Sequence, residues 1–471
     1  MKAPIKTDIC VIGAGSGGLS VAAGAVQMGA KVVLIEKDKM GGDCLNTGCV
    51  PSKALLAASK HAQAFRNSGP FGIKSATPDI DFAAVMAHVR GVINGIKPHD
   101  SVERFESLGV NVIKGAARFT SRSEVTVGEH RIQAKQFVIA TGSRATVPPI
   151  PGIDETDYLS NETLFDNTVL PDHLIIIGAG PIGMEMAQAH RRLGAKVTVL
   201  ERIRALPNDD PDLTAIVVNT LVNEGITIRE EVGVASVSGK TGHIRITLKD
   251  GEKIFGSHLL MATGRAPSVA DLGLCEAGIK YSRSGVEVDS RLRTTNKRVF
   301  AIGDAKGGLM FTHLAGYDAG IVIRNILFKL PSKANYSAIP WVTYTDPELS
   351  QVGLTEAQAK EQYGDAIKVV LWEYAENDRA RAERITSGLI KVVASKRGKI
   401  LGAGIAGASA GEIIQPWQIA VAKGYKMKDM AGIISPYPTL SEVSKRAAGS
   451  YFTDVLYSPR TRRIVQFLLK F

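Results

Sequence analysis

The feature that most constrains this chain is a glycine-rich unit that occurs twice. The first copy runs from an apolar, β-branched segment, Thr7–Ile12, through a glycine loop to a second apolar segment, Lys31–Ile35, which ends at Glu36. The glycines of the loop are Gly13, Gly15 and Gly18. They permit a tight turn, a close approach of the backbone to a pyrophosphate and close packing of helix on strand, while the acid accepts from ribose hydroxyls. This order predicts a dinucleotide-binding Rossmann unit.

The second copy begins 165 residues after the first, since its loop opens at Gly178 instead of Gly13. It has the strand His173–Ile177, the strand Lys196–Leu200 and the acid Glu201, and its loop glycines are Gly178, Gly180 and Gly183. Two complete units so far apart predict two dinucleotides and two nucleotide domains. The carboxylate of Glu201 favours NAD over NADP, although Arg202 and Arg204 would soften its rejection of a 2′-phosphate.

Length and charge limit the remaining choices. A chain of 471 residues should divide into about three domains. The net charge of +11 favours acidic ligands, and nucleotide phosphates explain it without a nucleic-acid partner, for which the sequence carries no motif. Four cysteines exclude a structural disulfide framework and indicate a reducing, cytoplasmic location. No apolar stretch is long enough to span a membrane.

A cysteine pair lies just after the first unit. Four residues separate Cys44 from Cys49, so a disulfide between them needs an irregular turn. A helix is expected to begin near Pro51, which places Cys49 at a helix N-terminus, where the dipole stabilises a thiolate. A zinc site lacks a second pair of ligands at suitable spacing, and no metal site is expected. Cys10, in a strand, and Cys275 are expected to be inert.

Two charged residues accompany the two nucleotide helices. Lys53 lies one helical turn after Cys49, and Glu185 follows the second glycine loop. An ammonium beside a bound redox cofactor would stabilise its reduced, anionic form, and a carboxylate would hold that ammonium in place. The alternative is that the two are unrelated surface charges.

The motif from Gly41 to Lys53 (GGDCLNTGCVPSK) resembles the active-site motif of the class I pyridine nucleotide–disulfide oxidoreductases, which include dihydrolipoamide dehydrogenase, glutathione reductase and mercuric reductase. Further matches along the chain are Ala140–Gly142 (ATG), Ala262–Arg265 (ATGR) and Ala301–Asp304 (AIGD). The resemblance implies FAD as cofactor, Cys49 as the flavin-contacting thiol and Cys44 as the interchange thiol. It also implies that Lys53 and Glu185 form the flavin-side pair.

The same resemblance implies further cofactor contacts. Asp304 would bind the ribityl chain of the flavin. Besides the acids and loop glycines already named, the expected cofactor-binding residues are Lys37, Gly42, Lys53, Ala116, Thr141, Gly142, Gly264 and Asp304.

The resemblance also implies an α/β fold with two Rossmann-like domains, for FAD and NAD, followed by an α+β dimerisation domain. The FAD domain is expected over residues 1–150 and again over 266–338, and the NAD domain over 151–265 between them. Residues 339–471 are expected to form the interface of a homodimer, with period-two strands such as Leu389–Val393.

One position departs from the family. Its thiol-handling members carry a histidine followed five residues later by a glutamate, whereas this chain has Tyr437 and Glu442, which would line the partner's active site. No histidine follows His313, and tyrosine is a poor base at neutral pH, which speaks against rapid turnover of dihydrolipoamide or glutathione disulfide. Mercuric reductase also has tyrosine there, but no cysteine follows Cys275 to form its terminal cysteine pair.

The expected function is electron transfer from a nicotinamide through FAD to the Cys44–Cys49 disulfide and on to a disulfide, metal-ion or quinone acceptor. Three alternatives are a dihydrolipoamide dehydrogenase of a 2-oxoacid dehydrogenase complex, a mercuric reductase-like metal reductase and a non-enzymatic, redox-responsive binding protein. The last rests on the basic, apolar segment from Arg460 to Phe471. We expect this segment to pack across the dimer, with weak contact to a membrane surface as the alternative.

Overall fold

The computed structural model describes residues 3–471 in two compact units. The first contains residues up to Gly178, Ala189–Leu200 and Gly233–Asn335, and the second contains Ala179–Gln188, Glu201–Val232 and Tyr336–Phe471.

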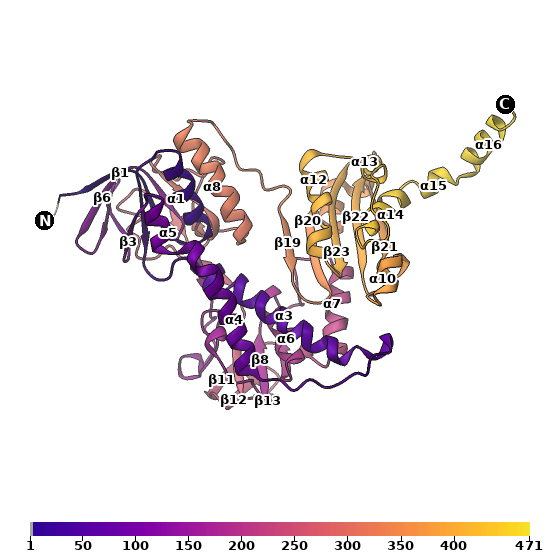
Figure 1. The fold of residues 1–471 in the computed structure, drawn as a ribbon, viewed down its shortest axis with the longest axis horizontal. Helices are drawn as coiled ribbons and strands as arrows, with labels where there is room; N and C mark the ends of the chain where they lie inside the picture. The colour runs from indigo at the N-terminus through magenta and orange to yellow at the C-terminus, as the bar shows by residue number, and fades with distance from the viewer. Residues whose placement is uncertain (1–2) are drawn as a thin grey trace. The chain divides into compact units, whose positions relative to one another are not determined.

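A seven-stranded sheet forms the centre of the first unit. Its strands, in spatial order, are β3 (Asn111–Lys114), β2 (Val32–Glu36), β1 (Ile5–Ile12), β6 (His130–Ile139), β5 (Glu124–Val127) and β4 (Arg118–Ser121), and β18 (Val299–Ala301) also pairs with β6. Strands β1, β2, β3, β6 and β18 are parallel. Helices α1 (Ser16–Gln27) and α8 (Thr312–Leu327) lie side by side (Figure 1). Parallel strands with a crossover helix after β1 confirm the first predicted Rossmann unit.

The second predicted Rossmann unit is also present. Strands β9 (Lys196–Leu200), β8 (His173–Ile177) and β14 (His258–Met261) are parallel neighbours, and α6 (Pro181–Arg192) connects β8 to β9. The predicted bounds of β8 and β9 are confirmed to the residue. An antiparallel sheet of β11 (Val234–Lys240), β12 (His243–Leu248) and β13 (Lys253–Gly256) follows in the chain.

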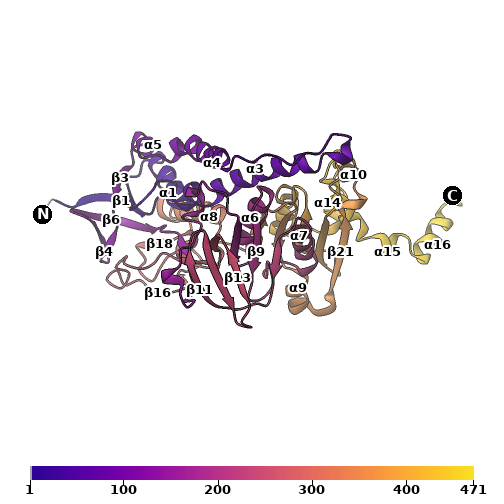
Figure 2. The ribbon, with the colours of Figure 1, turned by 90° about the horizontal axis from the view of Figure 1, so that it is seen from below.

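The cysteine segment enters a helical hairpin. After the short helix α2 (Gly42–Asn46), α3 (Cys49–Arg66) packs along α4 (Phe82–Ile96), as Figure 2 shows. The smaller elements of this unit include α5 (Val102–Ser107), β7 (Ser143–Ala145), β15 (Arg265–Pro267), β16 (Tyr281–Ser282) and β17 (Gly285–Val286).

The second unit is built on a five-stranded antiparallel sheet. Its strands are β19 (Pro340–Thr343), β20 (Glu348–Gly353), β23 (Ile400–Gly407), β22 (Leu389–Ser395) and β21 (Ile367–Glu373). Around them lie α7 (Pro211–Asn223), α9 (Glu356–Tyr363), α10 (Asp378–Ala382), α11 (Ala410–Ile413), α12 (Gln415–Lys423), α13 (Met427–Ala431) and α14 (Glu442–Ser450), followed by α15 (Thr453–Leu456) and α16 (Pro459–Leu468). This unit also contains the short strand β10 (Thr227–Arg229), which is not part of the five-stranded sheet. Tyr374 and Trp417 are fully buried in its core.

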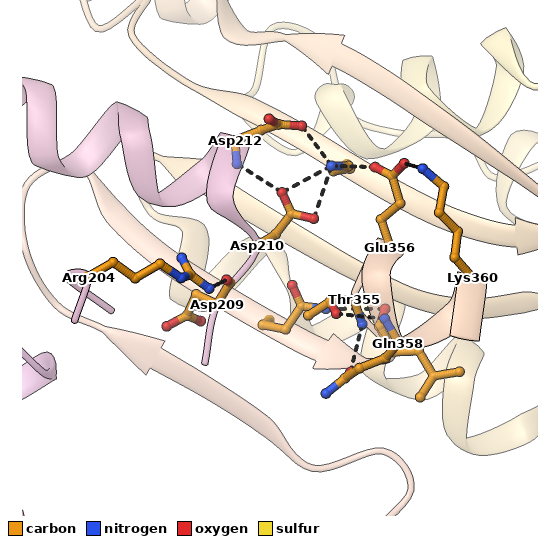
Figure 3. Close-up of polar contacts among 11 residues, drawn as sticks. Arg204, Asp209, Asp210, Asp212, Thr355, Glu356, Gln358 and Lys360 are labelled. Carbon is orange, nitrogen blue, oxygen red and sulfur yellow. Dashed lines mark hydrogen bonds and ion pairs between the residues drawn. The ribbon is translucent and has the colours of Figure 1, made fainter. Parts of the chain in front are cut away.

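A buried lysine joins α7 to this sheet. Lys391 of β22 reaches the carboxylates of Asp210, Asp212 and Glu356 at 3.0, 2.7 and 2.6 Å (Figure 3). The strand predicted over Leu389–Val393 is confirmed, but both of its faces are covered, since residues 390–394 of β22 are all buried. A charge is therefore buried in the middle of a sheet, where only full pairing makes it tolerable.

The observed α/β architecture with a separate C-terminal sheet confirms the predicted fold class. Within residues 3–471, no helix is both long and apolar enough to cross a membrane.

Candidate active site

The first glycine loop is closed against the strands behind it. Gly13 has φ +104°, and a Cβ there would lie 2.4 Å from the carbonyl oxygen of Ala140. A Cβ on Gly18 would lie 1.8 Å from the carbonyl oxygen of Gly13. Both positions therefore require glycine, and Ala14 and Ser16 alone carry side chains between Gly13 and Gly18.

Glu36 ends β2 beside this loop. Its buried carboxylate accepts from the amides of Ala14 at 2.6 Å and Asp38 at 2.8 Å. The predicted acid is thus fixed by two backbone donors at the position where a Rossmann unit contacts a ribose.

The second loop repeats this geometry. Gly178 has φ +108°, and a Cβ there would lie 2.4 Å from the carbonyl oxygen of Ala262, whereas a Cβ on Gly180 would meet nothing within 4 Å. Glu201 accepts from the amides of Ala179 at 2.9 Å and Ile203 at 3.0 Å. Each acid therefore braces its own glycine loop.

The two arginines after Glu201 differ in environment. The guanidinium of Arg204 donates to the carbonyl oxygens of Pro207 and Asp209, at 2.6 and 3.1 Å, so it is committed to its own loop. Arg202 is exposed. Both arginines were expected to weaken the rejection of a 2′-phosphate. Of the two, Arg204 is held by its own loop, whereas Arg202 is exposed.

The cysteine segment rests directly on the first glycine loop. Gly42 has φ +60°, and a Cβ there would lie 2.7 Å from the Cα of Gly15. Gly41, with φ +85°, forms a β-bridge with Gly15. The turn and α2 then carry Cys44, and α3 begins at Cys49, which confirms the predicted position of Cys49 at a helix N-terminus.

Both cysteines are thiols in the structure and interact with each other. The Sγ of Cys49 lies 3.5 Å from the Oγ1 of Thr312, the first residue of α8. Thr312 was not assigned a role from the sequence, because 263 residues separate it from Cys49.

The two thiols have very different proton affinities. The hydrogen bond from Cys44, with the Thr312 hydroxyl and the charge of Lys53, lowers the pKa of Cys49 to about 6 against the opposing effect of burial. The same hydrogen bond, with burial, raises the pKa of Cys44. At neutral pH the reduced pair is therefore a Cys49 thiolate beside a Cys44 thiol.

A polar network holds the turn between the cysteines. Asp43 accepts from the hydroxyl of Thr47 and the amide of Asn161, both at 2.8 Å, and pairs with Arg265 at 3.2 Å. Arg265 also donates to the hydroxyl of Ser143 at 2.8 Å.

Ser143 continues the network to the predicted flavin contact. Its hydroxyl donates to the carboxylate of Asp304 at 2.5 Å. The redox turn and Asp304 are thus connected through two intervening side chains, Arg265 and Ser143. Sequence reasoning missed Asn161 and Ser143 altogether, and it quoted Arg265 only as part of a motif.

The remaining predicted residues of the first unit lie around these loops. Lys53 is on α3, with its Nζ 3.4 Å from the hydroxyl of Ser52. Thr141 donates to the carbonyl oxygen of Ser268 at 2.7 Å. A Cβ on Gly142 or Gly264, both with positive φ, would meet nothing within 4 Å. Lys37 and Ala116 are exposed just after β2 and β3.

Glu185, Tyr437 and Glu442 belong to the second unit. Glu185 is buried on α6 and accepts from the amide of Tyr344 at 2.9 Å. Its pairing with Lys53 stays a prediction. Glu442 is the first residue of α14 and lies 3.7 Å from Arg446.

Tyr437 is 68 % exposed, and its hydroxyl donates to Asp378 at 3.3 Å. The negative charge of Asp378 raises the pKa of Tyr437, so the phenol stays protonated at neutral pH.

The two other cysteines differ from one another. Cys10 is fully buried in β1, and burial raises the pKa of its thiol, in keeping with the expected inertness. Cys275 is exposed instead of packed in a core, because it lies in the turn that follows Leu274.

A family model described as pyridine nucleotide-disulphide oxidoreductase matches residues 7–319, and the dimerisation-domain model of the same family matches residues 339–448. The chain belongs to the pyridine nucleotide-disulphide oxidoreductases. It is therefore a flavin-dependent enzyme of this family that works with FAD and a pyridine nucleotide, and its dimerisation domain indicates a homodimer.

Relatives of this oxidoreductase carry different names. It is 35 % identical to a mercuric reductase of Streptomyces lividans over 97 % of this chain and 98 % of the relative. It is 34 % identical to a dihydrolipoyl dehydrogenase of Staphylococcus aureus, over 94 % and 96 %. Among solved structures, the Cu(II) complex of the HOCl-induced flavoprotein disulfide reductase RclA from Escherichia coli matches with a TM-score of 0.86 and 29 % identity, over 94 % of this chain and 99 % of that one.

The residues of the first unit fit FAD. The glycine loop at the N-terminus of α1 suits a pyrophosphate, Glu36 suits a ribose, and Asp304 accepts from Ser143. The second loop, with an open face at Gly180 and a fixed carboxylate at Glu201, fits the adenosine half of a nicotinamide dinucleotide.

Proposed function

We propose that this oxidoreductase passes electrons from NADH to a disulfide formed by Cys44 and Cys49, and from the resulting dithiol to a thiophilic metal ion. The observation that carries the proposal is the asymmetric thiol pair at the N-terminus of α3, with Thr312 at 3.5 Å and Lys53 one turn away. A low pKa is what a nucleophilic or metal-binding sulfur needs.

FAD, when bound, would relay the two electrons of a nicotinamide hydride to the disulfide. Two electrons break the sulfur–sulfur bond, and one proton then gives the Cys49 thiolate and the Cys44 thiol. Lys53 and Thr312 stabilise the thiolate, and Asp304 and the two acids hold the cofactors. When both sulfurs bind the metal, Cys44 releases its proton to solvent, because metal coordination favours the thiolate. Two electrons then pass to one Hg(II), or one to each of two Cu(II), as the disulfide forms again.

The absence of a base supports a metal ion as the acceptor. Thiol–disulfide exchange with an organic substrate requires proton transfer to a leaving thiolate, which histidine performs near neutral pH. No histidine follows His313, and Tyr437 is kept protonated by Asp378. A metal cation needs no proton when it is reduced, so the lack of a base has little effect on the rate of its reduction. Tyr437 and Glu442 would line the site from the partner subunit.

NADH is favoured as the electron donor. The carboxylate of Glu201 is held in place by two backbone amides and would repel the 2′-phosphate of NADPH. Arg204 donates to its own loop and does not offset this repulsion. For the cofactor domains we propose the boundaries given above, with FAD held by residues 1–150 and 266–338, NADH by 151–265 and the dimer by 339–471.

A second candidate is dihydrolipoamide oxidation with NAD. The 34 % identity to a dihydrolipoyl dehydrogenase supports it. The segment Leu309–Ala315 (LMFTHLA) also supports it, because it resembles dihydrolipoamide dehydrogenase more than glutathione reductase. The substitution Tyr437→His separates the two candidates. If the chain lacks only the base, this variant should gain about 10²-fold in dihydrolipoamide turnover.

The experiment that tests the proposed function is steady-state NADH oxidation with Hg(II), Cu(II), lipoamide, glutathione disulfide and a quinone as acceptors. Metal-ion turnover should exceed turnover of the organic disulfides, and Cys44→Ser or Cys49→Ser should abolish it. A Cys275→Ser variant serves as the matched control and should retain the wild-type rate. Metal-dependent turnover that survives both active-site serines would refute the dithiol cycle.

A further inference from the structure

The last helix of this chain, α16, is exposed and carries large apolar side chains, as does a helix that docks on a surface outside its own subunit. From Pro459 to Phe471 every residue except Thr461 is exposed. The exposed apolar side chains are Ile464, Val465, Phe467, Leu468, Leu469 and Phe471. We call residues 459–471 the tail helix. Figure 1 shows it beyond α15 at the end of the chain.

One side of the tail helix is apolar. Phe467 and Leu468 lie three and four residues after Ile464, which places the three on one side of a helix. The ring of Phe471 extends this side, since it lies 5.4 Å from the ring of Phe467. Arg462 and Gln466, four residues apart, lie on the opposite side.

The tail helix carries charge of one sign only, and one of its cations, Arg460, lies on the same side as Ile464, four residues later. Residues 455–471 contain four cations, Arg460, Arg462, Arg463 and Lys470, and no acid. The nearest acid before them, Asp454, is paired with Lys368 of β21 at 2.8 Å, which also anchors α15 to the sheet. The tail helix therefore presents cations beside an apolar face, joined to a fixed point on the second unit.

The cations and the apolar side chains together indicate which kind of surface the tail helix binds. The matched dimerisation domain covers residues 339–448, so the tail helix lies beyond the segment that the family uses for dimerisation. An anionic lipid surface offers phosphate groups for the cations. Directly beneath them it offers acyl chains for Ile464, Phe467 and Leu468. We propose that the tail helix binds the enzyme reversibly to the surface of anionic membranes, which goes beyond the proposed electron transfer and does not depend on it.

The test uses the FAD-loaded enzyme and vesicles of phosphatidylcholine with about one third phosphatidylglycerol, in comparison with pure phosphatidylcholine. Wild type should sediment with the anionic vesicles at low salt and be released at high salt. Deleting residues 459–471 should abolish this binding while FAD content and NADH oxidation remain at wild-type levels.

Two double variants separate specific docking from general charge. Arg462→Gln with Arg463→Gln should weaken vesicle binding about 25-fold, at about fivefold per charge. The control Lys280→Gln with Arg283→Gln removes the same charge from two exposed positions of the first unit and should leave binding within about twofold. Phe467→Ser with Leu468→Ser tests the apolar face and should weaken binding without changing the net charge.

Three outcomes would overturn the proposal. They are the absence of binding to anionic vesicles at low salt, equal binding by the deletion variant, and equal losses from both charge variants. If the deletion instead halves the mass of the enzyme in solution, the tail helix belongs to the dimer interface and the proposal is wrong.

Discussion

At the scale of single residues, the reactivity of this site depends on which groups surround one sulfur. The sequence placed Cys49 at a helix N-terminus and Lys53 one turn later, and both are where they were expected. It did not reveal Thr312, because that hydroxyl arrives from a helix far along the chain. Local spacing predicts what one helix brings together, whereas contacts between distant segments depend on packing that spacing does not encode.

The Thr312 contact leads to the first prediction. Thr312→Val removes a donor to the thiolate and should raise the pKa of Cys49 from about 6 towards 7. Thr312→Ser keeps the hydroxyl and should restore the wild-type value. Thiolate absorbance of the reduced enzyme, followed against pH with Cys49→Ser as the blank, measures this shift. An unchanged midpoint in the valine variant would show that the 3.5 Å contact does not stabilise the thiolate.

A second residue should make stability depend on pH. Asp209 is buried, and burial raises its pKa to about 6 although Trp341 donates to it at 2.7 Å. The folded state thus holds this proton more tightly than the unfolded chain, so the associated stability is complete below pH ~4 and is lost as pH rises through about 6. The loss is at most about 3 kcal/mol.

Asp209→Asn keeps an acceptor for Trp341 but has no proton to lose. Its melting temperature should therefore fall less than that of wild type between pH 5 and pH 8. Parallel melting curves for the two proteins across this range would contradict a buried, titrating Asp209.

At the scale of elements, the sequence predicted those with strong local patterns. Both strand–glycine–helix–strand units were predicted because glycine loops and apolar runs are local signals. The cluster around Lys391 was not, since a lysine in an alternating strand normally faces solvent. Its burial follows from α7 packing on the sheet, and three carboxylates from two distant segments offset the cost.

This cluster should be important for the second unit. Lys391→Met leaves Asp210, which is 3 % exposed, without its cation and should destabilise folding by about 3–5 kcal/mol. Adding Asp210→Asn should recover part of this loss. The exposed Lys360, paired with Glu356 at 2.5 Å, provides the control, because Lys360→Gln should cost less than about 1 kcal/mol. Urea unfolding followed by tryptophan fluorescence compares the variants, and equal losses for the two lysines would refute a structural role for the buried cluster.

At the scale of the whole molecule, the cationic surface should act on the rate of coenzyme capture. A net charge of +11 attracts the pyrophosphate of NADH, and salt screens this attraction. The kcat/KM for NADH should therefore fall about threefold to tenfold between low and high ionic strength, with kcat nearly constant. A kcat/KM that does not change with salt would show that the surface charge has no part in capture.

The contact between Gly15 and Gly42 has a consequence for anyone who re-engineers this enzyme. The cofactor loop and the redox turn touch backbone to backbone, and a methyl group on Gly42 would lie 2.7 Å from the Cα of Gly15. The redox turn therefore cannot gain a side chain at Gly42 without displacing the cofactor loop. A transplant of this chemistry into a different scaffold must therefore carry both loops as a single inseparable part.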